Sequence, residues 1–326
     1  MNGMTDGKVQ GTATGTPVSD GELREAIMRL KKEKNAVIMA HYYQRDEIQE
    51  IADRVGDSLA LAQYAAETDA DVIVMCGVHF MGETAKILCP SKKVLIPDAD
   101  AGCSLADSCD PEEFARFIAE HPGHTVISYV NTSAAVKAHT DIVVTSGNAR
   151  KIIDSLPADE KIIFGPDRNL GGYINSVTGR DMLLWPGACH VHDRFSLAGI
   201  EELRAKHPGA KVLVHPECRK PLQIIADKVG STAALLDYAR KSDAGEFIVV
   251  TESGILFEMR RECPGKVFIP APAEDADCQC NMCEYMKLAT LRKVYECLLS
   301  DKPEITVEEG LAEKALRPIR RMLELS

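Results

Sequence analysis

Two segments of the chain, IMAHYYQRDEIQEIADRVGDSLALAQYA (residues 38–65) and VLVHPECRKPLQIIADKVGSTAALLDYA (residues 212–239), align without a gap at an offset of 174 residues. Twelve of the 28 aligned positions are identical, whereas unrelated segments of ordinary composition would share roughly one or two. The identical pairs include His41 with His215 and Asp53 with Asp227. Self-similarity of this kind marks a repeated structural unit, so the chain contains an internal duplication.

A third copy of the repeated unit lies between the first two. Residues 126–131 (VISYVN) align with residues 38–43 (IMAHYY) at an offset of 88, half of 176. This match is one of apolar pattern more than of identity. It predicts three units rather than two.

Each unit is expected to contain three short strands, because β-branched apolar runs end repeatedly near Gly, Pro, Asn or Asp. The first strands are predicted at 36–40, 125–128 and 211–214, the second at 71–75, 141–145 and 246–250, and the third at 93–96, 161–164 and 266–269. Helical patterns such as 48–67 and 221–241 separate them. Alternating strands and helices favour parallel sheets covered on both faces.

We therefore predict an α/β fold of three homologous α/β/α units around a pseudo-three-fold axis, at residues 21–109, 110–194 and 195–299. A single (β/α)₈ barrel fits the strand count loosely but not the three-fold period. The amphipathic segment within 300–326 is expected to pack on the first unit, with a dimerising helix as the alternative. Residues 1–20 are polar and read as a disordered tail rather than a signal peptide, which favours a cytoplasmic protein.

Composition excludes some classes of protein. Lys and Arg total 38 against 49 Asp and Glu, giving a net charge of −11, which argues against general affinity for nucleic acid or anionic membranes. No apolar run approaches the roughly 18 residues that a membrane-spanning helix needs.

The chain contains eleven cysteines, and without an export signal these are expected to be reduced thiols or metal ligands. Every predicted third strand is followed by a loop with cysteine: Cys103 in the first unit, Cys189 in the second, and Cys278, Cys280 and Cys283 in the third. One thiolate per unit would form a three-cysteine site at the axis. Such a set suits a [4Fe–4S] cluster with one open iron. A zinc knuckle or a redox Cys-x-x-Cys pair remains the alternative, and spacing does not choose among the three thiols of the last loop.

Polar side chains recur where the first strand of each unit ends. His41 and Tyr43, Tyr129 and Asn131, and His215 and Glu217 occupy matching positions. Recurrence of acid–base groups at equivalent positions favours a functional site over isolated structural residues. Ser58, Ser231 and Thr232 precede helical patterns, where they can cap a helix or help to bind an anion, and Ser146 and His192 are further candidates.

Six motifs together resemble the quinolinate synthase family over nearly the whole chain: MAHYYQ (39–44), GVHFMGETAK (77–86), YVNTS (129–133), PGACHVH (186–192), VHPE (214–217) and GST (230–232). The resemblance implies three α/β domains around a [4Fe–4S] cluster. It implies condensation of iminosuccinate with dihydroxyacetone phosphate to quinolinate, for NAD biosynthesis. An aspartate-oxidising enzyme would supply the iminosuccinate.

The resemblance also assigns residues. It implies Cys103, Cys189 and Cys283 as cluster ligands, and iminosuccinate contacts from His41, Ser58, Tyr129, Asn131, Ser146, His215, Glu217 and Thr232. Among groups able to transfer protons we expect Glu217 to be the base, with Tyr43, Tyr129 and His215 as further catalytic candidates. His41, His215 and helix N-termini are expected to supply positive surroundings for anionic substrates. The alternatives are a non-catalytic iron–sulfur sensor and a zinc-binding module.

Overall fold

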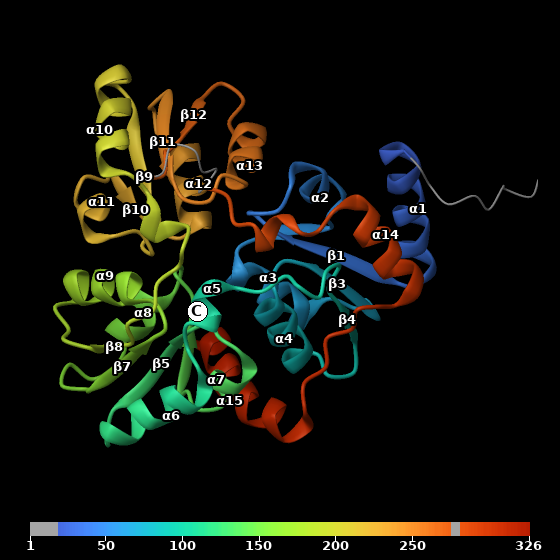
Figure 1. Ribbon diagram of the computed structural model, residues 1–326, viewed down its shortest axis with the longest axis horizontal. Helices are drawn as coiled ribbons and strands as arrows, with labels where there is room; N and C mark the ends of the chain where they lie inside the picture. The colour runs from blue at the N-terminus through green and yellow to red at the C-terminus, as the bar shows by residue number, and fades with distance from the viewer. Residues whose placement is uncertain (1–18, 275–280) are drawn as a thin grey trace, which may run out of the picture.

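The computed structural model describes residues 19–274 and 281–326, and the described residues form three four-stranded parallel sheets flanked by helices. Figure 1 shows the three units around a common centre, the first in blue to cyan, the second in green and the third in yellow to orange. The predicted α/β fold of three units is confirmed. The tail predicted at residues 1–20 lies almost entirely outside the described residues.

The first unit has the sheet order β2-β1-β3-β4. Its elements are α1 (Asp20–Glu33), β1 (Ala36–His41), α2 (Asp46–Ile51), β2 (Arg54–Gly56), α3 (Ser58–Glu67), β3 (Val72–Cys76), α4 (His79–Leu88), β4 (Lys93–Leu95) and α5 (Ser104–Asp107).

The second unit has the order β6-β5-β7-β8. It comprises α6 (Pro111–Glu120), β5 (Thr125–Tyr129), α7 (Ala134–Lys137), β6 (Ile142–Val144), α8 (Ala149–Asp154), β7 (Ile162–Gly165), α9 (Arg168–Thr178), β8 (Leu183–Leu184) and the 3₁₀ turn η1 (His192–Arg194).

The third unit has the order β10-β9-β11-β12. It comprises α10 (Leu197–Lys206), β9 (Lys211–Val214), α11 (Lys220–Ile224), β10 (Lys228–Val229), α12 (Thr232–Lys241), β11 (Glu246–Val250), α13 (Ile255–Glu262), β12 (Val267–Pro270) and η2 (Tyr285–Lys287). Two helices, α14 (Leu291–Ser300) and α15 (Glu309–Leu325), follow it.

Two expectations about the strands were wrong. The helical patterns at 48–67 and 221–241 are each interrupted by a short edge strand, β2 or β10, so the first and third sheets have four strands instead of three. In the second unit, the strand predicted as the second, at 141–145, is the edge strand β6, which corresponds to β2 and β10. Strands of two or three residues are too short to show a period of two in the sequence.

An aspartate at the same place in each unit attaches the edge strand to the first strand. Asp53, Asp141 and Asp227, spaced by 88 and 86 residues, each accept the backbone N–H of the first strand through Oδ2, at 2.8, 2.9 and 2.8 Å. Their own backbone N–H groups donate to the carbonyl of the same strand residue. This recurring pair of hydrogen bonds confirms the three-fold repeat.

A basic side chain also recurs at an equivalent position in each unit. Lys92, Arg180 and Lys266, also spaced by 88 and 86 residues, donate to backbone carbonyls at the end of a neighbouring helix or turn. A charged donor is favoured there because helix C-termini leave carbonyls without partners and carry partial negative charge.

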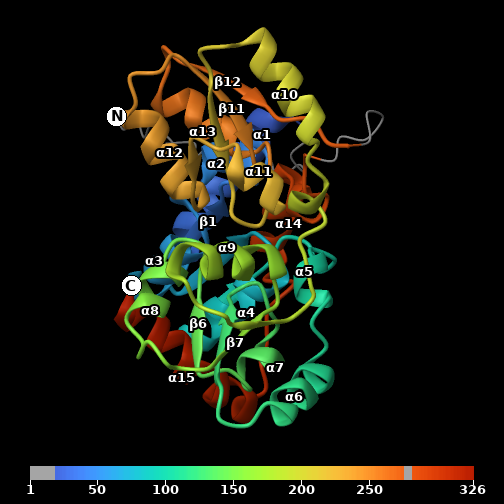
Figure 2. The ribbon, with the colours of Figure 1, turned by 90° about the vertical axis from the view of Figure 1, so that its left-hand side faces the viewer.

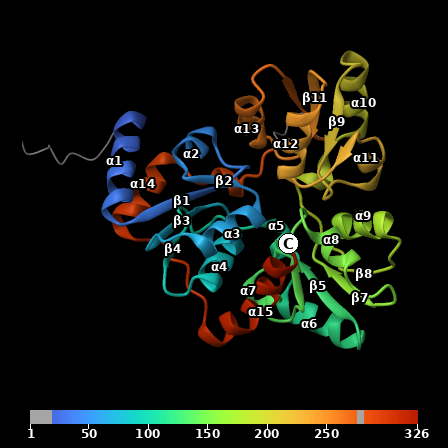
Figure 3. The ribbon, with the colours of Figure 1, turned by 180° about the vertical axis from the view of Figure 1, so that it is seen from behind.

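The last two helices connect the units rather than forming one of their own. Helix α14 packs on α1 of the first unit, as Figure 3 shows. Helix α15 packs against β6 and α7 of the second unit and α4 of the first, with Ala315, Ile319 and Met322 fully buried. Figure 2 shows this helix along the second unit. The expectation that residues 300–326 pack on the first unit is therefore incomplete, because α15 also packs on the second unit.

Within the described residues, none of the helices has the length and apolar character required to cross a membrane.

We predict that Asp227→Ala lowers the free energy of unfolding by about 1–3 kcal/mol, because it leaves the buried N–H of Val212 without its acceptor. Denaturant unfolding measures the change. Asp237→Ala is the matched control, since Asp237 is exposed and pairs with Lys241 one helical turn away, and it should change stability by less than about 0.5 kcal/mol. Equal losses in both variants would contradict the role of Asp227.

Candidate active site

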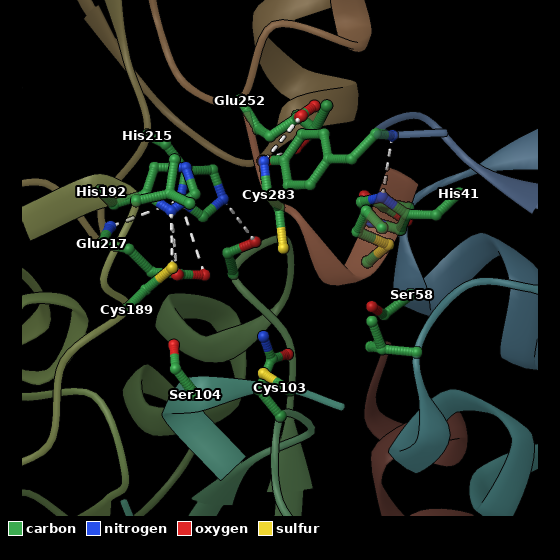
Figure 4. A pocket seen from close by; sticks show the side chains of 18 of the residues that line it. His41, Ser58, Cys103, Ser104, Cys189, His192, His215, Glu217, Glu252 and Cys283 are labelled. Carbon is green, nitrogen blue, oxygen red and sulfur yellow. Dashed lines mark hydrogen bonds and ion pairs between the residues drawn. The ribbon is translucent and has the colours of Figure 1, made fainter. Parts of the chain in front are cut away.

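A cavity lies where the carboxyl ends of the parallel strands of all three units meet. Ligands commonly bind at this end of parallel sheets. Figure 4 shows residues of the three units pointing toward one another across it. The lining includes all but one of the sequence-predicted site residues: His41, Tyr43, Ser58, Cys103, Tyr129, Asn131, Ser146, Cys189, His192, His215, Glu217, Thr232 and Cys283.

The exception is Ser231, which does not line the cavity. Its Oγ accepts the backbone N–H of Ala234 and caps helix α12. In the first unit the cap of α3 is Asp57, which leaves the Ser58 hydroxyl free to line the cavity. In both units the first residue of the pair, Asp57 or Ser231, caps the helix, and the next residue, Ser58 or Thr232, lines the cavity; Asp57 does both.

His41 and His215 adopt the same arrangement in the first and third units. Nδ1 of His41 accepts the backbone N–H of Tyr43 at 3.1 Å, and Nδ1 of His215 accepts that of Glu217 at 3.4 Å. Burial lowers the pKa of each imidazole to about 3. Both rings are therefore neutral at pH 7 with the proton on Nε2, and the expectation that they supply positive charge was wrong.

Glu217 is the buried acid of the cavity. Tyr129 donates its hydroxyl to Oε1 at 2.6 Å, and Nδ1 of His192 lies 3.2 Å from Oε2. Burial alone would raise the pKa of Glu217, but the neighbouring His192 and the hydrogen bond from Tyr129 hold this pKa below its usual range. Glu217 is thus a carboxylate at neutral pH, with hydrogen-bond donors on both oxygens.

Tyr43 and His192 connect the first and second units to the third. The Tyr43 hydroxyl lies 2.9 Å from Oγ1 of Thr232 and 2.7 Å from Oγ1 of Thr251, and Nε2 of His192 lies 2.9 Å from the same Thr251 oxygen. Burial raises the pKa of Tyr43 and of Tyr129 well above the usual value for tyrosine. Both phenols stay protonated at neutral pH and serve as hydrogen-bond donors.

The amide of Asn131 faces the cavity with its Oδ1 buried and without a hydrogen-bond partner among the described residues. A buried amide oxygen without a partner is unfavourable, so this oxygen is suited to accept a hydrogen bond from a ligand.

Cys103, Cys189 and Cys283 each follow the edge strand on the far side of their sheet, β4, β8 and β12. In the second unit this strand is β8, which is only two residues long and was not recognised from the sequence. The loop with Cys189 therefore follows β8 and not the strand predicted at 161–164. Burial raises the pKa of Cys103 to about 12 and that of Cys283 to about 11, and it raises the pKa of Cys189 well above that of a free thiol. Thiols of this kind become thiolates when a metal supplies positive charge.

The three sulfurs do not lie close enough together to be joint ligands of one small ion. The one described group of His, Cys, Asp or Glu ligand atoms that all lie within 4.8 Å of one another is Cys189 with His192 and Glu217. The three thiols are therefore more widely separated than the ligands of a single zinc ion, whose bonds to sulfur are about 2.3 Å. Cys278 and Cys280 lie outside the described residues.

Sequence reasoning missed two carboxylates that position the cysteine loops. Oδ2 of Asp167 accepts the backbone N–H of Cys189 at 3.2 Å, and Oε1 of Glu252 accepts that of Cys283 at 3.1 Å. Asp167 lies two residues after the end of β7, and Glu252 lies two residues after the end of β11. These two strands occupy the same position in their sheets. The sequence feature that could have identified these two residues is an acidic residue after a strand, at matching positions in two units.

The fold and this cavity define a three-unit α/β enzyme with a thiol-rich centre suited to a metal cofactor. The chain belongs to the family of quinolinate synthetase A proteins, whose pattern matches residues 25–324.

Individual relatives agree with the family match. The quinolinate synthase of Microcystis aeruginosa is 58% identical over 305 residues, which cover 94% of this chain and 95% of the relative. That of Synechocystis is 56% identical over 305 residues, covering 94% and 96%. That of Chloroherpeton thalassium is 55% identical over 309 residues, covering 95% and 96%.

We predict that Cys103→Ser, Cys189→Ser and Cys283→Ser each lose most of the bound iron in anaerobically purified protein, because each removes one thiolate from the cavity. Iron and sulfide analysis measures the loss. Cys76→Ala and Cys297→Ala, which alter buried thiols in the core behind the first sheet, should retain the iron. A Cys283→Ser protein with a full iron content would refute the third ligand.

We also predict that His41 lowers the stability of the protein in acid. Its pKa of about 3 lies below the unfolded value of 6.5, so the unfolded chain binds the extra proton and stability falls as the pH drops below 6.5. Between pH 6.5 and 5.5 this loss is about 1 kcal/mol, and His41→Gln should abolish that share. Denaturant unfolding at the two pH values measures it; an unchanged difference would show that His41 is not buried as the neutral form.

Proposed function

We propose that this chain catalyses quinolinate formation from iminosuccinate and dihydroxyacetone phosphate, with release of phosphate and two water molecules. One carbon–carbon bond and one carbon–nitrogen bond form, the phosphate ester is lost, and the remaining oxygens leave as water. Carbon, nitrogen and hydrogen balance without an oxidant or a reductant.

The observation that carries this proposal is the convergence of hydrogen-bond donors and one ionised carboxylate on a cavity shared by three units. Nε2–H groups of His41 and His215 and the hydroxyls of Ser58, Ser146 and Thr232 provide several donors for the carboxylates of iminosuccinate. Their arrangement supports substrate binding by hydrogen bonds from neutral groups.

Condensation, imine formation and dehydration all require proton transfers. Glu217 is ionised at neutral pH, so its carboxylate can accept a proton and later return it to a leaving hydroxyl. The hydroxyl of Tyr129 contacts this carboxylate, and the hydroxyl of Tyr43 belongs to the hydrogen-bond network of Thr251 and His192. We assign Glu217 as the base, with Tyr129, Tyr43 and His215 as donors that orient the reacting groups.

The residues present fit a [4Fe–4S] cluster held by Cys103, Cys189 and Cys283, since three separated thiols face one cavity from three units. With three protein ligands, such a cluster supplies an open iron that acts as a Lewis acid toward substrate oxygen. Asp167 and Glu252 hold two of the three cysteine loops in place through backbone hydrogen bonds.

A zinc site is the second candidate, because Cys189, His192 and Glu217 could bind a single ion. Zinc at that position would occupy the proposed base and remove it from proton transfer. Metal analysis of anaerobically purified protein separates the two: about four irons per chain supports the cluster, and zinc without iron refutes it.

The same proposal implies a supplier and a compartment. Iminosuccinate must come from an enzyme that oxidises aspartate, so functional coupling to such an enzyme is expected. The nine described cysteines are all free thiols, which supports a reducing compartment such as the cytoplasm.

We predict that Glu217→Gln lowers kcat by about 10²–10⁴-fold while changing KM far less, because Gln keeps the size and hydrogen bonds but does not accept a proton at neutral pH. Quinolinate formation by the anaerobic holoenzyme measures both constants. Glu258→Gln is the control, a buried glutamate of α13 paired with Arg261 outside the cavity. An effect on KM alone would make Glu217 a substrate-positioning residue.

A further inference from the structure

The cavity has an unexpected charge balance. Among the described residues that line it there is no lysine or arginine, while Asp57, Glu217 and Glu252 contribute carboxyl groups. His41 and His215 are neutral at pH 7. A dicarboxylate would therefore enter a site without positive charge on its surface, unless a cation behind the lining compensates.

Lys137 is such a cation. It is the last residue of helix α7, and its side chain is fully buried. Its Nζ donates to the carbonyl of Val130 at 2.8 Å and to the carbonyl of Thr132. These two carbonyls flank Asn131, whose amide lines the cavity. The ammonium group therefore lies directly behind a segment of the cavity wall.

The other two units show that a positive charge is not required to donate hydrogen bonds to these two carbonyls. Gln49 and Gln223 occupy the positions equivalent to Lys137, at spacings of 88 and 86 residues. Their Nε2 atoms donate to carbonyls of the corresponding loops, Tyr42 and Gln44 in the first unit and Pro216 and Cys218 in the third. A neutral amide thus satisfies the same pair of carbonyls in two of the three units.

The charge of Lys137 is also not neutralised by an ion pair. None of the described carboxylates forms a salt bridge with it, although Glu83 and the thiol of Cys103 lie near enough to favour its charged form. Its Nζ lies 5.4 Å from the centre of the Phe80 ring, which lines the cavity. By contrast, the partly buried Lys287 pairs with Glu252 at 3.0 Å. Burial lowers the pKa of Lys137 to about 8, which leaves most of the side chain protonated at pH 7.

Burying an unpaired ammonium group is costly, so a lysine in place of the glutamine of the other units needs a compensating interaction. We propose that Lys137 is the electrostatic anchor of the cavity: its charge, acting through the Asn131 loop and across Phe80, stabilises a dicarboxylate bound against that wall. It acts as a positioning residue without touching the ligand. This inference rests on the proposed function, since it deepens the account of how the same site binds an anionic substrate.

The test compares a charged and an uncharged probe of the same shape. Isothermal titration calorimetry of the anaerobic holoenzyme with succinate should show a loss of affinity of roughly tenfold or more in Lys137→Gln, the size expected when one charge is removed from a partly desolvated site. Titration with succinamide, which carries no charge, should show little change.

Lys266→Gln is the matched control. It removes the same charge from another lysine that donates to backbone carbonyls, but one that does not line or adjoin the cavity. It should bind succinate as the unaltered protein does. Circular dichroism and iron content should be normal in Lys137→Gln, because glutamine fills the same position in two units.

Several results would overturn the proposal. These are unchanged succinate affinity in Lys137→Gln, an equal loss for succinate and succinamide, loss of the iron or of the fold in this variant, and failure of the unaltered protein to bind succinate. An unaltered protein that binds succinate but makes no quinolinate would instead refute the proposed function and leave the role of Lys137 in anion binding intact.

Discussion

The structure depends on how the loops at the carboxyl ends of the first strands are held. Each loop leaves two backbone carbonyls inside the protein, and in each unit one side-chain nitrogen, from Gln49, Lys137 or Gln223, donates to both. Gln49 also donates to the carbonyl of Gly254 in the third unit, and Gln223 lies 3.4 Å from that of Asn169 in the second. Because buried carbonyls without donors are costly, these contacts fix both the loops and the joints between units.

Rigid loops of this kind allow acid–base groups to stand close together without being exposed to water. His41 and Tyr129 end β1 and β5, and His215 directly follows the equivalent strand β9. The residues two positions further, Tyr43, Asn131 and Glu217, extend the same wall. Burial keeps the imidazoles and phenols neutral, and the hydrogen bonds around Glu217 keep its carboxylate ionised. Each unit therefore contributes an equivalent part of the cavity wall, and different residues at equivalent positions give each part a different chemical role.

The cysteine side of the cavity is built by a different strand of each sheet. Cys103, Cys189 and Cys283 follow the far edge strands, and buried carboxylates hold the backbone of two of them. The first unit has Val78 at the position of Asp167 and Glu252, so its loop is placed without such a contact. The three units are thus equivalent in topology but not in charge.

The sequence by itself determined the three-fold repeat, the parallel α/β architecture and most members of the site. These features follow from identical residues at fixed spacing and from apolar runs, and both can be recognised without knowledge of tertiary contacts. The sequence did not reveal β2, β8 and β10, because strands of two or three residues carry no periodic signal and form through pairing with a neighbour. Tertiary structure alone decided that His41 and His215 are neutral, that Ser231 caps a helix while Thr232 lines the cavity, and that Lys137 is buried behind Asn131 without a salt bridge. Charge state and side-chain direction depend on burial and on partners distant in sequence, and only the assembled units bring those partners together.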